Sequence, residues 1–203
     1  MVALTWLGKA LPQVDTHLYR LVDQQVYLPQ EPETPETPEA SDRLASETAA
    51  TVSPVEAWRN HLIHGDRLQA LSALLPTLAC QVNLIYVDPP FMTGRTFNNG
   101  EQLSTATRVS YKDTWKNSLD IYLQWLYETF HCLYLLLAEN GSCYIHLDWR
   151  AAHYAKIILD EIFAPVPGGG FKNEIIWHYQ SGGRARKTFA RKHDTILLYT
   201  KSA

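Results

Sequence analysis

The chain has 203 residues, of which 46% are hydrophobic, and a formal net charge of −3. This length predicts one domain with a buried core, and the longest apolar run of its helical region, Leu133–Ala138, is far too short to span a membrane. Met1–Ala10 lacks a secretory signal, so we expect a cytoplasmic protein. Three cysteines lie in apolar stretches without metal-ligand spacing, and we expect no metal site and buried, reduced thiols at Cys80, Cys132 and Cys143.

Two regions precede the predicted domain. Residues 1–28 are mildly apolar and predict a short helix or a docking arm. Residues 29–54 are rich in Pro, Glu and Thr, with six acids and one base, and cannot bury enough apolar surface to offset their chain entropy. We predict a disordered acidic linker there and a folded domain over residues 55–203. Without the linker the chain carries a net charge of about +2, and its bases concentrate between Arg184 and Lys201.

The folded region begins with a pattern typical of a βαβ unit. His61–His64 predicts a short strand, Asp66 can cap a helix over Arg67–Leu75, and Pro76 ends that helix. The apolar run Leu84–Val87 follows and is stopped by two prolines. Such a run predicts a parallel strand buried on both faces. The rigid loop at its carboxyl end is the place where open α/β sheets bind ligands.

The residues of this loop suit a planar ring that carries an amino group. The Asp88 carboxylate and the carbonyls of Asp88 and Pro89 accept hydrogen bonds, and no proline N–H competes with them. Phe91 offers a flat apolar face. A flipped-out adenine or cytosine has the matching shape and donors. The alternative is structural, a strand that simply ends in a rigid turn.

Polar loops and further periodic segments follow. Residues 91–117 predict a lid beside the strand end, in which Arg95 either meets a phosphate or is solvated. Periodicity then predicts two helices, Ser118–Glu139 (with Asn140-Gly141 as its stop signal) and Arg150–Phe163, and three strands, Ser142–Leu147, Asn173–Trp177 and His193–Tyr199.

A basic, glycine-containing loop separates the last two predicted strands. Its bases can contact DNA phosphates, although a solvated loop is the alternative: Arg184, Arg186, Lys187, Arg191 and Lys192. The adjacent pair His193-Asp194 could indicate acid–base chemistry. No nucleophile accompanies that pair in the sequence, so we favour a structural role for it.

The tetrad Asp88-Pro89-Pro90-Phe91 resembles the catalytic motif of amino-group DNA methyltransferases. The flanking sequence from about His64 to Ser202, including Thr93-Gly94-Arg95 and Tyr111-x-Asp113-x-Trp115, is similar to adenine-specific members related to the modification subunits of type III restriction systems. For the Tyr-x-Asp-x-Trp segment, local packing of two aromatic rings is the alternative interpretation. The resemblance implies transfer of a methyl group from S-adenosylmethionine to adenine N6 in flipped-out, double-stranded DNA. It implies that Asp88, Pro89, Pro90 and Phe91 form the catalytic site and that Asp66 lies close to the cofactor.

The same resemblance implies a partial α/β fold of the S-adenosylmethionine-dependent methyltransferase (Rossmann-like) type, with a mostly parallel sheet and helices on both faces. The Phe-x-Gly-x-Gly motif of the cofactor-binding half does not occur in the sequence. We therefore expect a truncated or split catalytic half that works with a second fragment carrying the cofactor-binding half, or with a restriction subunit. The alternatives are a non-catalytic DNA- or partner-binding remnant, and methyl transfer to cytosine N4, RNA or a protein glutamine.

Overall fold

The computed structural model describes residues 3–16, 60–98, 110–115, 118–163, 167–180 and 187–202. Within these ranges the chain forms three helices, α1 (Arg67–Leu78), α2 (Leu119–Leu136) and α3 (Ala152–Phe163). The strands of the same ranges are β1 (Val82–Val87), β2 (Thr96–Asn98), β3 (Ser110–Lys112), β4 (Leu137–Leu147), β5 (Gly170–His178) and β6 (His193–Thr200). The predicted acidic linker at 29–54 lies outside the described residues.

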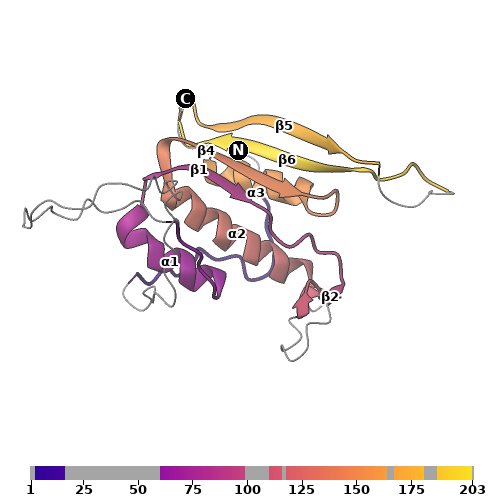
Figure 1. The fold of residues 1–203 in the computed structure, drawn as a ribbon, viewed down its shortest axis with the longest axis horizontal. Coiled ribbons are helices and arrows are strands. Elements are labelled where there is room, and N and C mark those ends of the chain that lie inside the picture. The colour runs from indigo at the N-terminus through magenta and orange to yellow at the C-terminus, as the bar shows by residue number, and fades with distance from the viewer. Residues whose placement is uncertain are drawn as a thin grey trace, which may run out of the picture.

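The main sheet is mixed, with the strand order β1-β4-β6-β5 (Figure 1). Only β1 and β4 run parallel, whereas β4–β6 and β5–β6 are antiparallel pairs. The prediction of a mostly parallel sheet is therefore wrong. The physical reason is the connection between β5 and β6, which are consecutive and pair as a hairpin, whereas a parallel pair would need a crossover element. A small antiparallel pair, β2–β3, stands apart from the main sheet.

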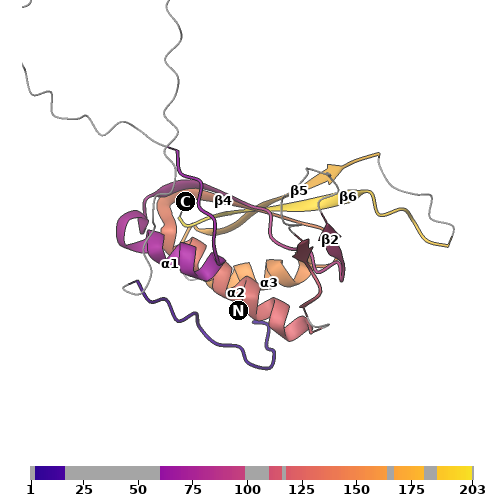
Figure 2. The same ribbon diagram turned by 60° about the horizontal axis from the view of Figure 1, so that its bottom comes forward.

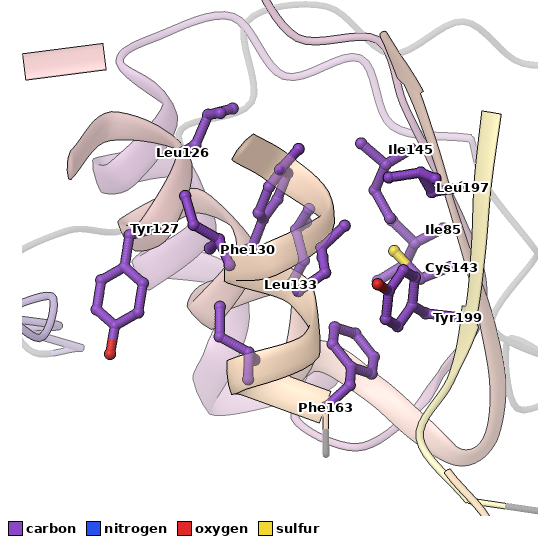
Figure 3. Close-up of a cluster of buried hydrophobic side chains, with 14 of the residues drawn as sticks. Ile85, Leu126, Tyr127, Phe130, Leu133, Cys143, Ile145, Phe163, Leu197 and Tyr199 are labelled. Carbon is purple, nitrogen blue, oxygen red and sulfur yellow. The ribbon is translucent and has the colours of Figure 1, made fainter. Parts of the chain in front are cut away.

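All three helices lie on one side of this sheet in both ribbon views (Figures 1 and 2). The side chains of Ile85, Ile145 and Tyr199 point from the sheet toward α2 and α3, where they meet Phe130 and Phe163 (Figure 3). Burial of these apolar side chains is the main stabilising contribution to the domain.

The opposite sheet face carries no helix from the described part of the chain. Leu84 on β1 is 64% exposed, and Trp177 on β5 is 53% exposed. Two predictions are corrected by this arrangement: helices do not cover both faces, and the strand before Asp88 is not buried on both sides. A continuous apolar run indicates that both faces of a strand are apolar. It does not indicate which elements pack on either face.

Several element boundaries differ from the predictions. His61–His64 is irregular rather than a strand, so no βαβ unit forms there. Helix α1 continues through Pro76 to Leu78, because Leu75 and Leu78 pack on the core and this packing overrides the local preference. Helix α2 ends at Leu136, and the predicted stop signal at Asn140-Gly141 lies inside β4.

Residues 3–16 form an arm that packs on the helices without being helical itself. The Trp6 ring lies edge-on to Tyr127 at 5.6 Å, and the Trp6 indole N–H donates to Gln124 at 3.2 Å. The Lys9 ammonium pairs with Glu161 at 2.7 Å. The predicted arm over residues 1–28 extends beyond this range and stays a prediction there. No helix among the described residues is long and apolar enough to cross a membrane.

The three cysteines differ in accessibility. Cys132 and Cys143 are buried as predicted, whereas Cys80 is exposed, which corrects the prediction for that thiol. Cys80 has a backbone φ of +57° in the turn between α1 and β1, and this turn holds it at the surface.

We expect only Cys80 to react quickly with iodoacetamide in the folded protein at pH 8. Burial raises the pKa of the Cys132 thiol to about 11 and that of Cys143 to about 12, so both stay protonated and shielded from the reagent. Peptide mapping by mass spectrometry after short labelling measures this, and labelling in urea is the control in which all three should react. Native labelling of Cys143 as fast as Cys80 would contradict the buried position.

Candidate active site

The tetrad Asp88–Phe91 follows β1 directly and lies at the carboxyl ends of the parallel pair β1 and β4. The hydroxyl of the buried Tyr122 on α2 donates a 2.7 Å hydrogen bond to the Pro90 carbonyl and so anchors the loop from below. Phe91 packs against the core, and its ring centroid lies 5.6 Å from that of His146. The Asp88 side chain is 59% exposed. The loop therefore presents this carboxylate to solvent from a rigid base.

A buried histidine beside Asp88 forms the centre of a polar cluster that the sequence did not predict. His146 on β4 is 7% exposed, and its Nδ1 lies 2.8 Å from the Tyr86 hydroxyl and 4.0 Å from Asp88 Oδ1. Its Nε2 lies 3.3 Å from Asp194 Oδ2. The Tyr179 hydroxyl donates to the other Asp194 oxygen at 3.3 Å. The sequence analysis favoured a structural role for the His193-Asp194 pair. In the fold, Asp194 contacts His146 and Tyr179 within this polar cluster.

Strand alternation was the signal that could have found this cluster. Tyr86 and His146 occupy the uncovered sheet face because Tyr86 pairs with Tyr144, two residues before His146. Trp177 lies on the same face, with its ring centroid 5.4 Å from that of His146. The strand order β1-β4-β6-β5 is needed to bring these positions together, and the sequence does not specify it.

The two tyrosines of the cluster are held in their protonated form. Partial desolvation and the charge of Asp88 raise the pKa of Tyr86. Desolvation and the neighbouring Asp194 carboxylate raise the pKa of Tyr179. Both hydroxyls are therefore hydrogen-bond donors at neutral pH.

The loop after the tetrad is held by Asp113, which is 1% exposed. Its carboxylate accepts hydrogen bonds from the Met92 N–H at 3.1 Å, from the Thr93 N–H at 2.6 Å and from the Thr93 hydroxyl at 2.7 Å. It also accepts from the Trp115 indole N–H at 2.5 Å. Met92 and Trp115 have φ values of +58° and +47°, which are uncommon for residues with a side chain.

The Tyr-x-Asp-x-Trp segment also contributes an aromatic contact. The Trp115 ring packs against Tyr122 on α2 at 5.0 Å, whereas the predicted packing of the segment's two aromatic rings involves the Tyr111 side chain, which lies outside the described part of the chain. The acid between the aromatic residues stabilises the two strained positions and fixes the loop that follows Phe91. Asp113 therefore supports the tetrad through the loop that follows it.

Among the predicted DNA contacts, Arg95 directly precedes β2 and Lys192 directly precedes β6. Strand β2 and the start of β6 lie toward the same end of the molecule (Figure 1). Arg95, Lys187 and Arg191 are exposed, and Arg191 stacks its guanidinium 3.8 Å above the Trp149 ring. Lys192 is half-buried and donates to the Gln180 carbonyl at 3.2 Å. Arg184 and Arg186 lie outside the described residues.

Comparison with known proteins identifies the family. The sequence profile of the N6/N4 methylases, described as DNA methylase, matches residues 82–203, which is more than half of the chain. The chain belongs to this DNA methylase family. The match begins at the first residue of β1 and includes the tetrad, the His146 cluster and the β5–β6 hairpin. The family resemblance inferred from the tetrad is confirmed.

Curated relatives of this chain include enzymes of restriction–modification systems. The Mod subunit of the type III enzyme EcoP15I from Escherichia coli is 26% identical over 158 residues, which cover 70% of this chain and 24% of that subunit. The DNA adenine methyltransferase YhdJ from Escherichia coli K12 is 28% identical over 143 residues, 70% of this chain and 41% of that enzyme. The type II methyltransferase M.KpnI from Klebsiella pneumoniae is 24% identical over 153 residues, with coverages of 74% and 34%. The chain thus spans less than half the length of each.

The tetrad and Asp66, which the sequence predicted for the acceptor and donor sides of a methyl transfer, have different surroundings. On the acceptor side, Asp88 and Phe91 supply a carboxylate and an aromatic ring. On the donor side, Asp66 caps α1, and its Oδ1 accepts from the Leu68 and Gln69 N–H groups at 3.0 and 3.2 Å. The predicted cap is confirmed, whereas a contact of Asp66 with S-adenosylmethionine stays a prediction.

Proposed function

We propose that this DNA methylase domain methylates adenine N6 in double-stranded DNA, with S-adenosylmethionine as the methyl donor. The observation that carries the proposal is the exposed Asp88 carboxylate on a rigid Pro-Pro-Phe loop, at the carboxyl end of β1, in a chain of the DNA methylase family. The amino group of a base that is stacked and paired inside a duplex cannot reach the Asp88 carboxylate on this loop. The target base is therefore flipped out of the duplex.

In this proposal the tetrad binds the amino group and the ring of the target base. Asp88 and the Pro89 carbonyl accept hydrogen bonds from the amino group, while Pro90 and Phe91 hold the loop and offer a face for the ring. The Asp88 charge stabilises the positive charge that develops on the attacking nitrogen. S-adenosylmethionine supplies an electrophilic methyl group when it is bound. Positioning of the nitrogen by the rigid loop supplies a further part of the rate.

We further propose that a second half completes the donor pocket, whether on the same polypeptide or on a separate subunit. Strand β1 is at the edge of the sheet, and β4 is its only strand partner in the described sheet. Leu84 and Tyr86 on this strand are 64% and 56% exposed. An open edge with exposed apolar side chains suits pairing with another strand. Asp66 would then meet the cofactor between the two halves.

DNA binding is proposed for the bases at the tetrad end of the sheet. Arg95 lies on the loop held by Asp113, because the Asp113 N–H donates to the Arg95 carbonyl at 2.8 Å. Lys187, Arg191 and Lys192, together with Arg184 and Arg186, belong to the β5–β6 connection. Bases at both places would contact phosphates on either side of a flipped nucleotide and position the duplex without reading its sequence.

The test is methyl transfer from labelled S-adenosylmethionine to mixed-sequence duplex DNA, by the chain alone and with a polypeptide that carries the cofactor-binding half. Nucleoside analysis by mass spectrometry should show N6-methyladenine. N4-methylcytosine would instead assign the cytosine reaction, and label in RNA or protein would assign another substrate class. Absence of transfer by folded protein in both settings, with DNA still bound, would make the domain a non-catalytic binding module.

A further inference from the structure

We propose that His146 is a positioning residue that works through Asp88 and accepts the proton released from the amino group during methylation. This inference rests on the proposed function and adds a group that neither the tetrad nor the family assignment supplies. It starts from the contacts of the His146 ring, both of whose nitrogens face a polar partner in the described structure.

Those contacts determine which ring nitrogen carries the hydrogen. The Asp194 carboxylate can only accept, so Nε2, at 3.3 Å, is the donor to it. The Tyr86 hydroxyl donates to Nδ1 at 2.8 Å. In neutral His146 the unprotonated nitrogen is therefore Nδ1, which accepts from Tyr86 and has the Asp88 Oδ1 4.0 Å away. This nitrogen is the one that could receive a proton from the substrate side.

Groups from three elements face the two nitrogens of His146. Asp88 from the tetrad loop lies 4.0 Å from Nδ1, and Asp194 from β6 lies 3.3 Å from Nε2. Among the described residues, Tyr86 from β1 also contacts the ring through its hydroxyl. Tyr179 does not contact the ring itself but donates a hydrogen bond to Asp194. The other neighbours are the rings of Phe91 and Trp177, which carry no charge. An orienting acid behind a histidine is the arrangement that general bases use elsewhere.

The proton balance of the reaction requires such an acceptor. The amino nitrogen forms a bond to the methyl carbon while the carbon–sulfur bond of the donor breaks, and the nitrogen then carries two hydrogens, the methyl group and a positive charge. One proton passes to the Asp88 carboxylate, while the electron pair of the N–H bond stays on nitrogen. The Tyr86 O–H then turns to solvent, Nδ1 of His146 takes the proton from Asp88, and the new ring N–H donates to the Tyr86 oxygen. His146 later releases the proton to water through the Tyr86 hydroxyl, on a side chain that is 56% exposed.

The first measurement is NMR of the histidine rings in the protein without DNA or cofactor. Long-range ¹⁵N–¹H correlations should show neutral His146 protonated on Nε2. The Asp88→Asn variant should shift the Nδ1 signal of His146 and leave the exposed His153 on α3 unchanged. A neutral ring protonated on Nδ1, or a His146 Nδ1 signal that is the same in wild type and Asp88→Asn, would overturn the proposal. This test needs no substitution of His146.

The second measurement is the pH dependence of single-turnover methyl transfer in the assembly that is active. His146→Gln should lower the rate about 100-fold, leave KM for DNA within about twofold, and change the pH profile of the rate, because a proton acceptor is lost. His153→Gln is the matched control and should keep both the rate and the pH profile. If His146→Gln does not fold, Asp194→Asn replaces it, because it removes the orienting charge and preserves side-chain shape.

The two measurements separate this inference from the proposed function. An unchanged rate and pH profile in His146→Gln would overturn the proton route while leaving methyl transfer by the tetrad intact. An inactive wild-type protein with the expected NMR pattern would instead overturn the proposed function, and the proton route with it, while the pairing of His146 with Asp88 would stand.

Discussion

Replacement of Asp88 by alanine is expected to lower methyl transfer about 1000-fold in the assembly that is active. The reason is that its carboxylate is the group that stabilises charge on the attacking nitrogen, and loss of one such preorganised group typically costs a factor of about 100 to 1000. Because the Asp88 side chain is 59% exposed, the free energy of unfolding should change by less than about 0.5 kcal/mol. Single-turnover methylation and urea unfolding measure the two effects.

A matched control separates the role of Asp88 from a general charge effect. Glu174 on β5 is also an exposed acid of the main sheet, but it lies on the strand at the opposite edge from β1. Glu174→Gln should keep methyl transfer within about twofold, whereas Asp88→Asn should lose most of it, because an amide neutralises the charge. Activity of Asp88→Ala within tenfold of the wild type would show that the tetrad acid is dispensable and would remove the basis of the proposed mechanism.

Replacement of Asp113 by alanine is expected to lower the free energy of unfolding by about 3 kcal/mol. Each buried donor left without a partner typically costs about 1–3 kcal/mol, and this carboxylate accepts from two backbone N–H groups, a hydroxyl and an indole N–H. The strained backbone at Met92 and Trp115 loses its compensation at the same time. Urea unfolding followed by tryptophan fluorescence measures the change.

The neighbouring Thr93 provides the graded control for this prediction. Thr93→Val removes only the hydroxyl that donates to Asp113 at 2.7 Å, so it should cost about 1 kcal/mol. Asp113→Ala should also weaken methyl transfer, because the loop behind Phe91 is no longer fixed. A loss of stability below about 1 kcal/mol in Asp113→Ala would mean that the loop finds other partners and that the carboxylate is not its anchor.

The amino-acid sequence alone was sufficient for features that depend on near neighbours. The end of the strand before Asp88 was predictable because two prolines lack the N–H groups that a strand ladder needs. The helix cap by Asp66 was predictable because a carboxylate at that position accepts from the N–H groups two and three residues later. The strand at His193–Thr200 was predictable because it contains the consecutive apolar residues Ile196–Tyr199. The tetrad together with the flanking sequence from about His64 to Ser202 was enough to indicate the family.

Only the tertiary structure decided which distant segments meet. Strand β6 lies between β4 and β5 in the sheet. This strand order places the Asp194 carboxylate beside His146. Asp113 reaches Met92 and Thr93 through the loop closure around β2 and β3, which no local pattern specifies. Local rules report the backbone preference of a segment, whereas sheet order and buried polar contacts depend on the free energy of the whole packed arrangement. For this reason the tetrad could be recognised from the sequence, while its supporting residues became visible only in the fold.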